Sequence, residues 1–122
     1  MTDQEMNEKL AEFSGFRLLE YFDMQGIGRG RHWELPDKAN GLLKFYSLPD
    51  FRSLDALLEY AVPKLNAMSI YPELFQEKYT KDHLWHCDMG QYPIIGNEDA
   101  GIAFRDAILK ILEEEEKWKA ND

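Results

Sequence analysis

The sequence is poor in cysteine, in long apolar runs and in positive charge. Its one cysteine, Cys87, excludes an intramolecular disulfide and a zinc site made of four cysteines. No apolar run approaches the roughly 20 residues that a membrane-spanning helix needs. The first ten residues are acidic and polar, unlike a signal peptide. Together these absences predict a protein of the reducing cytoplasm without a membrane partner.

Basic residues are outnumbered by acidic ones, 14 against 23, and the formal net charge is −9. Since affinity for a phosphate backbone comes largely from Lys and Arg, this charge predicts no direct nucleic-acid partner and no binding to anionic membranes. Two interpretations of the acidity stay open. It can serve solubility, or it can complement a basic partner, for example by occupying a groove that otherwise holds nucleic acid.

The first fourteen residues have the pattern of an amphipathic helix. Thr2 and Glu5 form a capping box, in which Thr2 accepts from a helical N–H group and Glu5 reaches back. Apolar residues then recur at three- and four-residue steps as far as Phe13. Gly15 suits the left-handed residue that ends a helix. We therefore expect the first helix to end at Gly15.

Short segments rich in aromatic and large apolar residues predict strands at 16–22, 32–35, 42–46, 73–79 and 84–88. The polar stretch 80–82 has a suitable length for a hairpin loop, and 36–41 has the composition of a turn. The strands come in neighbouring groups with short connections. That arrangement favours antiparallel hairpins over parallel units with helical crossovers.

Two further helices follow from apolar residues at helical spacing. The stripe over 54–68 predicts a helix capped by Ser53, with Asp50 as the competing cap. Pro63 lies inside this stripe and lacks an N–H group, so we expect a kink or a break there. Asn97 is expected to cap the last helix, whose core face is rich in alanine and whose end, 113–116, is acidic and solvated.

These elements predict one α+β domain over residues 1–122. Hydrophobic residues make up 44% of the chain and aromatic residues 13%, which is enough for one packed core. We expect about four mostly antiparallel strands packed with three helices, in the order α-β-β-α-β-β-α.

Glycines at alternate positions between 26 and 30 predict a flexible loop. Its N–H groups and two arginines could cradle an anion, although the spacing matches neither the dinucleotide fingerprint nor the P-loop. It is therefore either a surface turn or a contact with a nucleotide-like ligand or a partner. In the second case the binding residues would be Arg29, Arg31, His32 and Trp33.

His83, His86 and Cys87 suggest a metal at first sight. On a strand, however, side chains alternate, so His83 and Cys87 would face one way and His86 the other. A shared metal would need ligands from elsewhere, and His32 is the only other histidine. We therefore expect no metal, no cofactor and a core position for Cys87. No nucleophile-elbow or triad pattern is present, so we also expect no enzymatic activity.

Several segments carry a resemblance to a known family. They are Leu48–Ala56 (LPDFRSLDA), Ala61–Leu65 (AVPKL), the helix 6–12 before Gly15-Phe16, the strand 85–87 and the alanine-rich helix 100–108. In these segments the sequence resembles the phage ABA-sandwich domain family, short phage and prophage proteins of largely unknown function. The resemblance implies an α/β/α sandwich and a bacterial host cell as its setting.

The functional expectation is a small phage or prophage protein that binds a host protein, such as a defence protein, and modulates or inhibits it without catalysis. The acidic charge, the lack of a catalytic set and the resemblance all favour it. The alternative is an oligomer that sequesters a nucleotide-type signal, with segment 26–33 at the lip of its site. A homodimer is compatible with either function.

Overall fold

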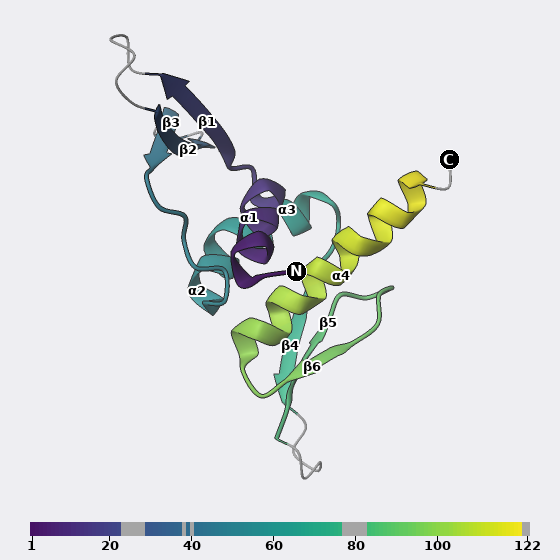
Figure 1. The fold of residues 1–122 in the computed structure, drawn as a ribbon. Helices are drawn as coiled ribbons and strands as arrows, with labels where there is room; N and C mark the ends of the chain where they lie inside the picture. Colours follow the sequence, from purple (N-terminus) through teal and green to yellow (C-terminus); the bar gives the residue numbers. More distant parts are fainter. Residues whose placement is uncertain (23–28, 38, 40, 77–82, 121–122) are drawn as a thin grey trace.

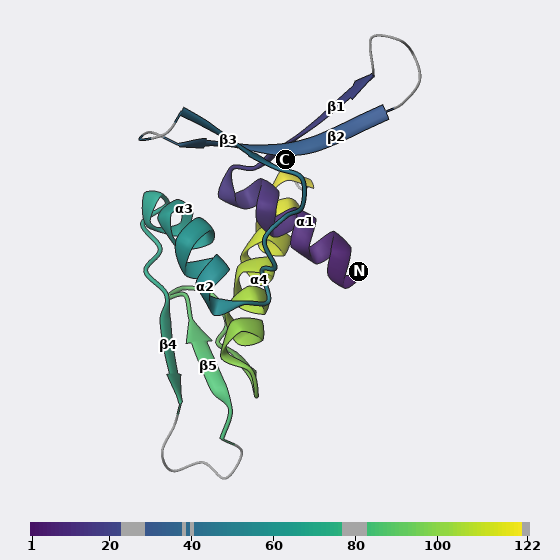
Figure 2. The same cartoon turned by 90° about the vertical axis from the view of Figure 1, so that its left-hand side faces the viewer.

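The computed structural model describes residues 1–22, 29–37, 39, 41–76 and 83–120. In chain order the elements are α1 (Asp3–Ser14), β1 (Arg17–Phe22), β2 (Arg29–Asp37), β3 (Gly41–Phe45), a central helical segment made of α2 (Leu54–Ala56), η1 (Leu57–Ala61) and α3 (Val62–Ala67), then β4 (Glu73–Gln76), β5 (Trp85–Asp88), β6 (Ile95–Asn97) and α4 (Ala100–Ala120). The helices lie between two antiparallel three-stranded sheets, β1-β2-β3 and β4-β5-β6 (Figures 1 and 2).

The α+β class, the three helical segments and the antiparallel pairing are as expected, but the strand count and order are wrong. The described residues contain six strands in two sheets, in the order α-β-β-β-α-β-β-β-α. β2 begins at Arg29, inside the segment predicted to be a loop. β6 was missed because it has three residues, with a glycine at its centre, and takes its strand form from pairing with β5. The helices separate the sheets instead of covering one sheet on both faces.

The predicted first helix and both its ends are confirmed. The Thr2 hydroxyl accepts from the Glu5 N–H at 3.1 Å and donates to the Glu5 carboxylate at 3.2 Å, so Glu5 reaches back to the side chain of Thr2. Gly15 adopts the left-handed conformation with φ 107°. The Phe16 N–H then donates to the Ala11 carbonyl at 2.9 Å. This cap turns the chain sharply and directs the Phe16 ring into the core, where it is 2% exposed.

A cluster of aromatic rings joins the β1–β3 sheet to the helices. The ring centroid of Phe16 lies 5.1 Å from Phe45 on β3, 5.2 Å from Tyr60 in η1 and 6.2 Å from Phe51, each with an edge-to-face tilt. The ring centroid of Tyr60 also lies 6.2 Å from that of Phe45 and 6.3 Å from that of Phe51. Such pairs contribute roughly 0.5–1.5 kcal/mol each beyond the area they bury. The sheet is therefore held to the body mainly by side chains.

Pro63 is accommodated by a π-helical turn instead of a sharp break. Across η1 the helix takes the wider spacing, so the Val62 N–H donates to the Leu57 carbonyl five residues earlier. Pro63 then stands in the first turn of α3, where its missing N–H matters least. Leu57, Ala61 and Leu65 are fully buried, so the altered turn keeps the apolar stripe on the core side.

The second sheet packs against α4, whose apolar face includes Ala103, Phe104, Ala107, Ile108 and Ile111, all nearly inaccessible. The predicted cap of this helix was wrong by two residues. Asp99 accepts from the Ile102 N–H at 3.0 Å, which makes it the cap. Asn97 ends β6 and accepts from the Asp99 N–H at 2.9 Å. Both side chains therefore accept from a backbone N–H group at the entry to α4.

The distal end of α4 is charged, as predicted. Lys110 and Lys117 lie 3.5–3.8 Å from Glu113 and Glu114 within the helix, and Lys9 of α1 bonds Glu116 at 3.0 Å. These partly exposed pairs each contribute at most about 0.5 kcal/mol. Among the described helices, none combines the length and the apolar character needed to cross a bilayer.

We expect Phe16→Ala to lower the free energy of unfolding by about 3–5 kcal/mol, because it leaves a cavity where three rings converge. Denaturant unfolding measures this change, and hydrogen exchange should show loss of protection in β1–β3 before the other sheet. The loss for Phe16→Leu, which keeps much of the side-chain volume, should lie between zero and the loss for Phe16→Ala. Tyr71→Ala removes a ring that is 70% exposed and should change stability by less than about 0.5 kcal/mol. Equal losses at positions 16 and 71 would contradict the role of the cluster.

Candidate functional site

The β1–β3 sheet has one face toward the helices and one face away from them. Trp33 pairs with Leu18 and Phe45; it is buried in the core, and the partly buried Phe45 packs against that core. Since side chains alternate along a strand, the neighbouring residues of β2 point the opposite way. In Figure 2 the sheet is seen nearly edge-on, with the helices on one side and no described element on the other. We call this second side the outer face; its main side chains are Arg17, Leu19, Tyr21, His32, Glu34, Leu42, Lys44 and Tyr46.

A buried polar pair lies at the centre of the outer face. His32 and Glu34 are only 9% and 8% exposed, and His32 Nε2 lies 2.9 Å from Glu34 Oε1. The rings of Tyr21 and Tyr46 flank the imidazole, with centroids 5.6 and 6.2 Å away. Tyr21 can lie there because its cross-strand neighbour, Gly30, has no side chain, and a Cβ at that position would collide with the ring. The hydrogen bond offsets the cost of burying both groups.

Large apolar side chains surround this pair and stay accessible. Leu19, Tyr21 and Leu42 are 42%, 48% and 47% exposed, and Tyr46 is 80% exposed. An ordinary solvated sheet face carries polar residues at such positions. A gathering of exposed leucine and tyrosine on one sheet face is instead typical of an interaction surface.

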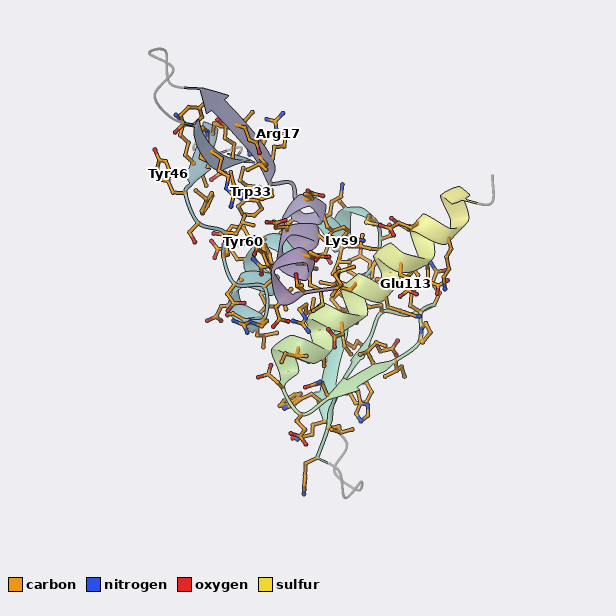
Figure 3. All side chains as sticks on the ribbon, viewed as in Figure 1. Lys9, Arg17, Trp33, Tyr46, Tyr60 and Glu113 are labelled. Atoms are coloured by element: carbon orange, nitrogen blue, oxygen red, sulfur yellow. The ribbon has the colours of Figure 1, made fainter. Side chains whose placement is uncertain are left out.

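The accessible charge of the outer face is positive. Arg17 and Lys44 stand directly opposite Glu34, one on each neighbouring strand, and both are exposed. Within the described part of the chain neither makes an ion pair, whereas the Glu34 carboxylate is bonded to His32. Residues 16–47 contain five basic and four acidic side chains, so their formal charge is +1 and the remainder of the chain carries −10. Figure 3 shows Arg17 and Tyr46 on the sheet and Glu113 on α4, away from it.

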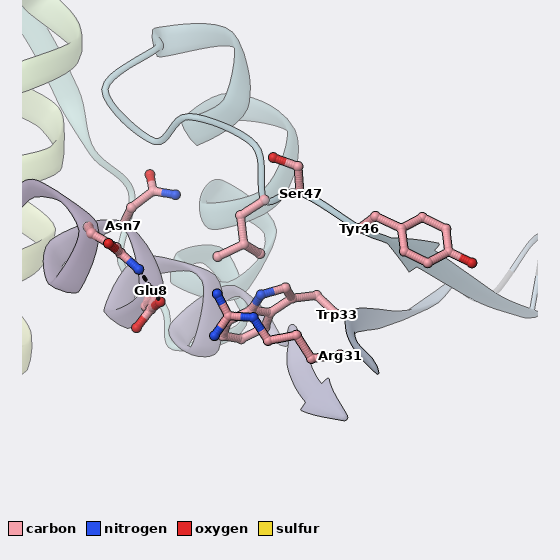
Figure 4. Close-up of a pocket in the computed structure, with 8 residues that line it drawn as sticks. Asn7, Glu8, Arg31, Trp33, Tyr46 and Ser47 are labelled. Carbon is pink, nitrogen blue, oxygen red and sulfur yellow. Dashed lines mark hydrogen bonds between the residues drawn. The ribbon is translucent and has the colours of Figure 1, made fainter. Parts of the chain in front are cut away.

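On the other face of the sheet, a pocket of about 260 Å³ lies between the sheet and α1 (Figure 4). It is lined by Gln4, Asn7, Glu8, Arg31, Trp33, Tyr46, Ser47 and Leu48. The Arg31 and Trp33 side chains extend toward α1, and Tyr46 points the other way. Trp33 is 7% exposed, so most of its ring is used in the core.

A second hollow of about 230 Å³ adjoins the first along α1 and shares Gln4, Asn7 and Leu48 with it. Its two arginines are already engaged. Arg52 forms a two-contact pair with Asp50, at 2.9 and 3.1 Å, which lowers the pKa of that carboxyl. Arg105 is bonded to Asp106 at 3.0 Å. Neither guanidinium is free for an added anion.

The structure divides the four predicted binding residues. Arg31 and Trp33 line one pocket, and His32 points to the opposite face. Arg29 lies in β2, but its side chain is outside the described residues, as are positions 26–28. The prediction of a loop is wrong for 29–31, since these residues pair with β1. Sequence reasoning missed Tyr21 and Tyr46. Their signal was that β1 and β3 carry large apolar residues on both faces of the strand, where a solvated face would carry polar ones.

The histidines near Cys87 do not form one site. His83 precedes β5 with φ 50°, so the predicted alternation does not extend to it. The His86 ring stacks on Phe75 with centroids 5.5 Å apart, and its Nε2 has no hydrogen-bond partner among the described residues. Cys87 is fully buried, as predicted. In the part of the chain that the structure describes, no group of three or more His, Cys, Asp or Glu side chains could hold a metal ion.

Burial, with a smaller contribution from Asp88, raises the pKa of the Cys87 thiol from 9.0 to about 11. We expect the free energy of unfolding to fall as the pH rises from about 9 to about 11, because the unfolded thiol loses its proton first. Urea unfolding of the wild type and Cys87→Ala measures this change. The advantage of the wild type should be fully present below pH 9 and shrink above it. A constant difference between the two proteins would contradict the assignment.

The chain matches no protein-family model, and searches of curated proteins and of solved structures found no similar chain. The resemblance to the phage ABA-sandwich family therefore stays a prediction from the sequence.

Proposed function

We propose that this chain is a non-catalytic binding protein that docks a protein of its bacterial host on the outer face. The observation that carries the proposal is the set of four large apolar side chains left accessible around the buried His32–Glu34 pair. Removing large apolar side chains such as leucine and tyrosine from water is favourable, so a partner that covers them gains the free energy of their burial.

The side chains of the outer face are also held in place before a partner binds. Tyr21 is held by the space over Gly30 and by contact with His32, and the sheet below is fixed by the aromatic cluster. Side chains that are already ordered lose little entropy when a partner binds. Other exposed apolar residues, such as Leu58, Tyr71 and Ile94, lie on separate segments and form no comparable group.

The bacterial setting and the host partner rest on the resemblance to phage and prophage proteins. A short protein of that kind can act on a host protein by covering part of its surface, without an active site. Modulation or inhibition of a host defence protein is the role we propose.

A second candidate is a nucleotide-like ligand in the pocket that Arg31 and Trp33 share. It is favoured by Arg31, which has no ion-pair partner among the described residues. It ranks lower because the pocket, at about 260 Å³, is below the usual range for small-molecule sites and little of the Trp33 ring is free for stacking. Thermal shift with saturating ATP or a cyclic dinucleotide decides it: stabilisation lost in Arg31→Ala supports the ligand, and no stabilisation removes it.

For the protein partner, we expect the double variant Leu42→Ser/Tyr46→Ser to lose at least about tenfold in capture of host proteins from bacterial lysate, since truncated interface anchors typically cost 2 kcal/mol or more. Quantitative mass spectrometry of proteins retained on the immobilised chain measures it. Leu58→Ser/Tyr71→Ser is the matched control, because these side chains are 52% and 70% exposed and lie on other elements. A partner list unchanged by the outer-face variant would sink the proposal, as would the absence of any specific partner.

A further inference from the structure

The partner's chemistry can be read from the charge on the outer face, and this step rests on the proposed function. We infer that the outer face binds a protein segment in which carboxylates bracket an apolar side chain. The feature that carries the inference is the row formed by Arg17, Glu34 and Lys44 across the three strands.

The row contains two free cations and one satisfied anion. Glu34 is 8% exposed and bonded to His32, so its carboxylate is not offered to a partner. Arg17 and Lys44 are exposed, and neither has an ion-pair partner in the described residues. Neighbouring strands lie about 4.8 Å apart, so the two cations stand on the order of 10 Å apart across the sheet. A segment with two carboxylates at a similar separation can engage both.

Apolar side chains lie beside this row. Leu19 and Tyr21 continue β1 away from Arg17, and Leu42 and Tyr46 stand on either side of Lys44 along the chain. Between them Tyr21 and Tyr46 cover His32, which leaves an apolar floor next to the cations. A bound segment can therefore place an aliphatic or aromatic side chain on this floor while its carboxylates reach Arg17 and Lys44.

The same charges disfavour two other occupants. In a symmetric dimer centred on this row, the cations Arg17 and Lys44 of one copy would lie close to those of the other, which costs free energy unless an anion intervenes. For a single-stranded nucleic acid the tyrosines would offer stacking, but residues outside 16–47 carry 19 acidic and nine basic side chains and repel a long phosphate backbone. The test below includes a measurement that would detect each of these occupants.

The test is selection of a displayed random peptide library on the purified full chain. Three baits are used: the wild type, Arg17→Glu/Lys44→Glu, and the control Lys64→Glu/Lys117→Glu, which reverses two exposed lysines elsewhere. We expect the wild type and the control to enrich peptides with Asp or Glu around an apolar residue. These peptides should bind Arg17→Glu/Lys44→Glu about tenfold more weakly, and that bait should enrich Lys and Arg instead. A merely structural effect of the substitutions would weaken binding without reversing the preferred charge.

Failure of the inference is distinguishable from failure of the proposed function. Peptides that are lost with Leu42→Ser/Tyr46→Ser but show no preference for carboxylates overturn the inference and leave the docking face intact. Peptides that bind equally to that variant overturn both. Two further measurements overturn the inference in favour of another occupant: light scattering that shows a dimer broken by Arg17→Glu/Lys44→Glu, and fluorescence anisotropy that shows oligothymidylate binding broken by it.

Discussion

The contact of the Phe16 ring with Phe45 and Tyr60 is the interaction on which the placement of the outer face depends. Phe16 follows Gly15, whose left-handed conformation turns the chain from α1 into β1. Gly15 therefore ends the helix, and Phe16, the next residue, anchors the strand that follows. The β1–β3 sheet is held to the helices on one side by this cluster and by Trp33, and no described element covers its other side.

The charge of the molecule also differs between the β1–β3 sheet and the rest of the chain. The strands of the first sheet and their connections are nearly balanced in charge, whereas the helices and the second sheet carry the excess of carboxylates. Such an excess of carboxylates repels polyanions at long range. At short range, within a Debye length of about 8 Å, Arg17 and Lys44 dominate what a partner meets on the outer face. Net charge alone would have suggested a basic partner, and the local arrangement suggests the opposite.

Local features of the fold were predictable from the sequence, and nonlocal ones were not. The Thr2 cap and Gly15 were readable because capping depends on neighbours a few residues away. The shift of the last cap from Asn97 to Asp99 was not, because both residues can cap and the choice is made by the pairing of β6. The position of the helices between two sheets depends on contacts far apart in the chain, and no periodicity reports it.

The candidate site shows the same limit more sharply. The sequence grouped Arg31, His32 and Trp33 in one candidate site, whereas the alternation along β2 places Arg31 and Trp33 on one face of the sheet and His32 on the other. Once Trp33 is buried against the helices, every residue of the outer face follows, since a slip of one residue would expose Trp33 and bury the Glu34 carboxylate among apolar side chains. The core thus selects the register, and the register selects the outer face, on which Tyr21 and Tyr46 stay exposed.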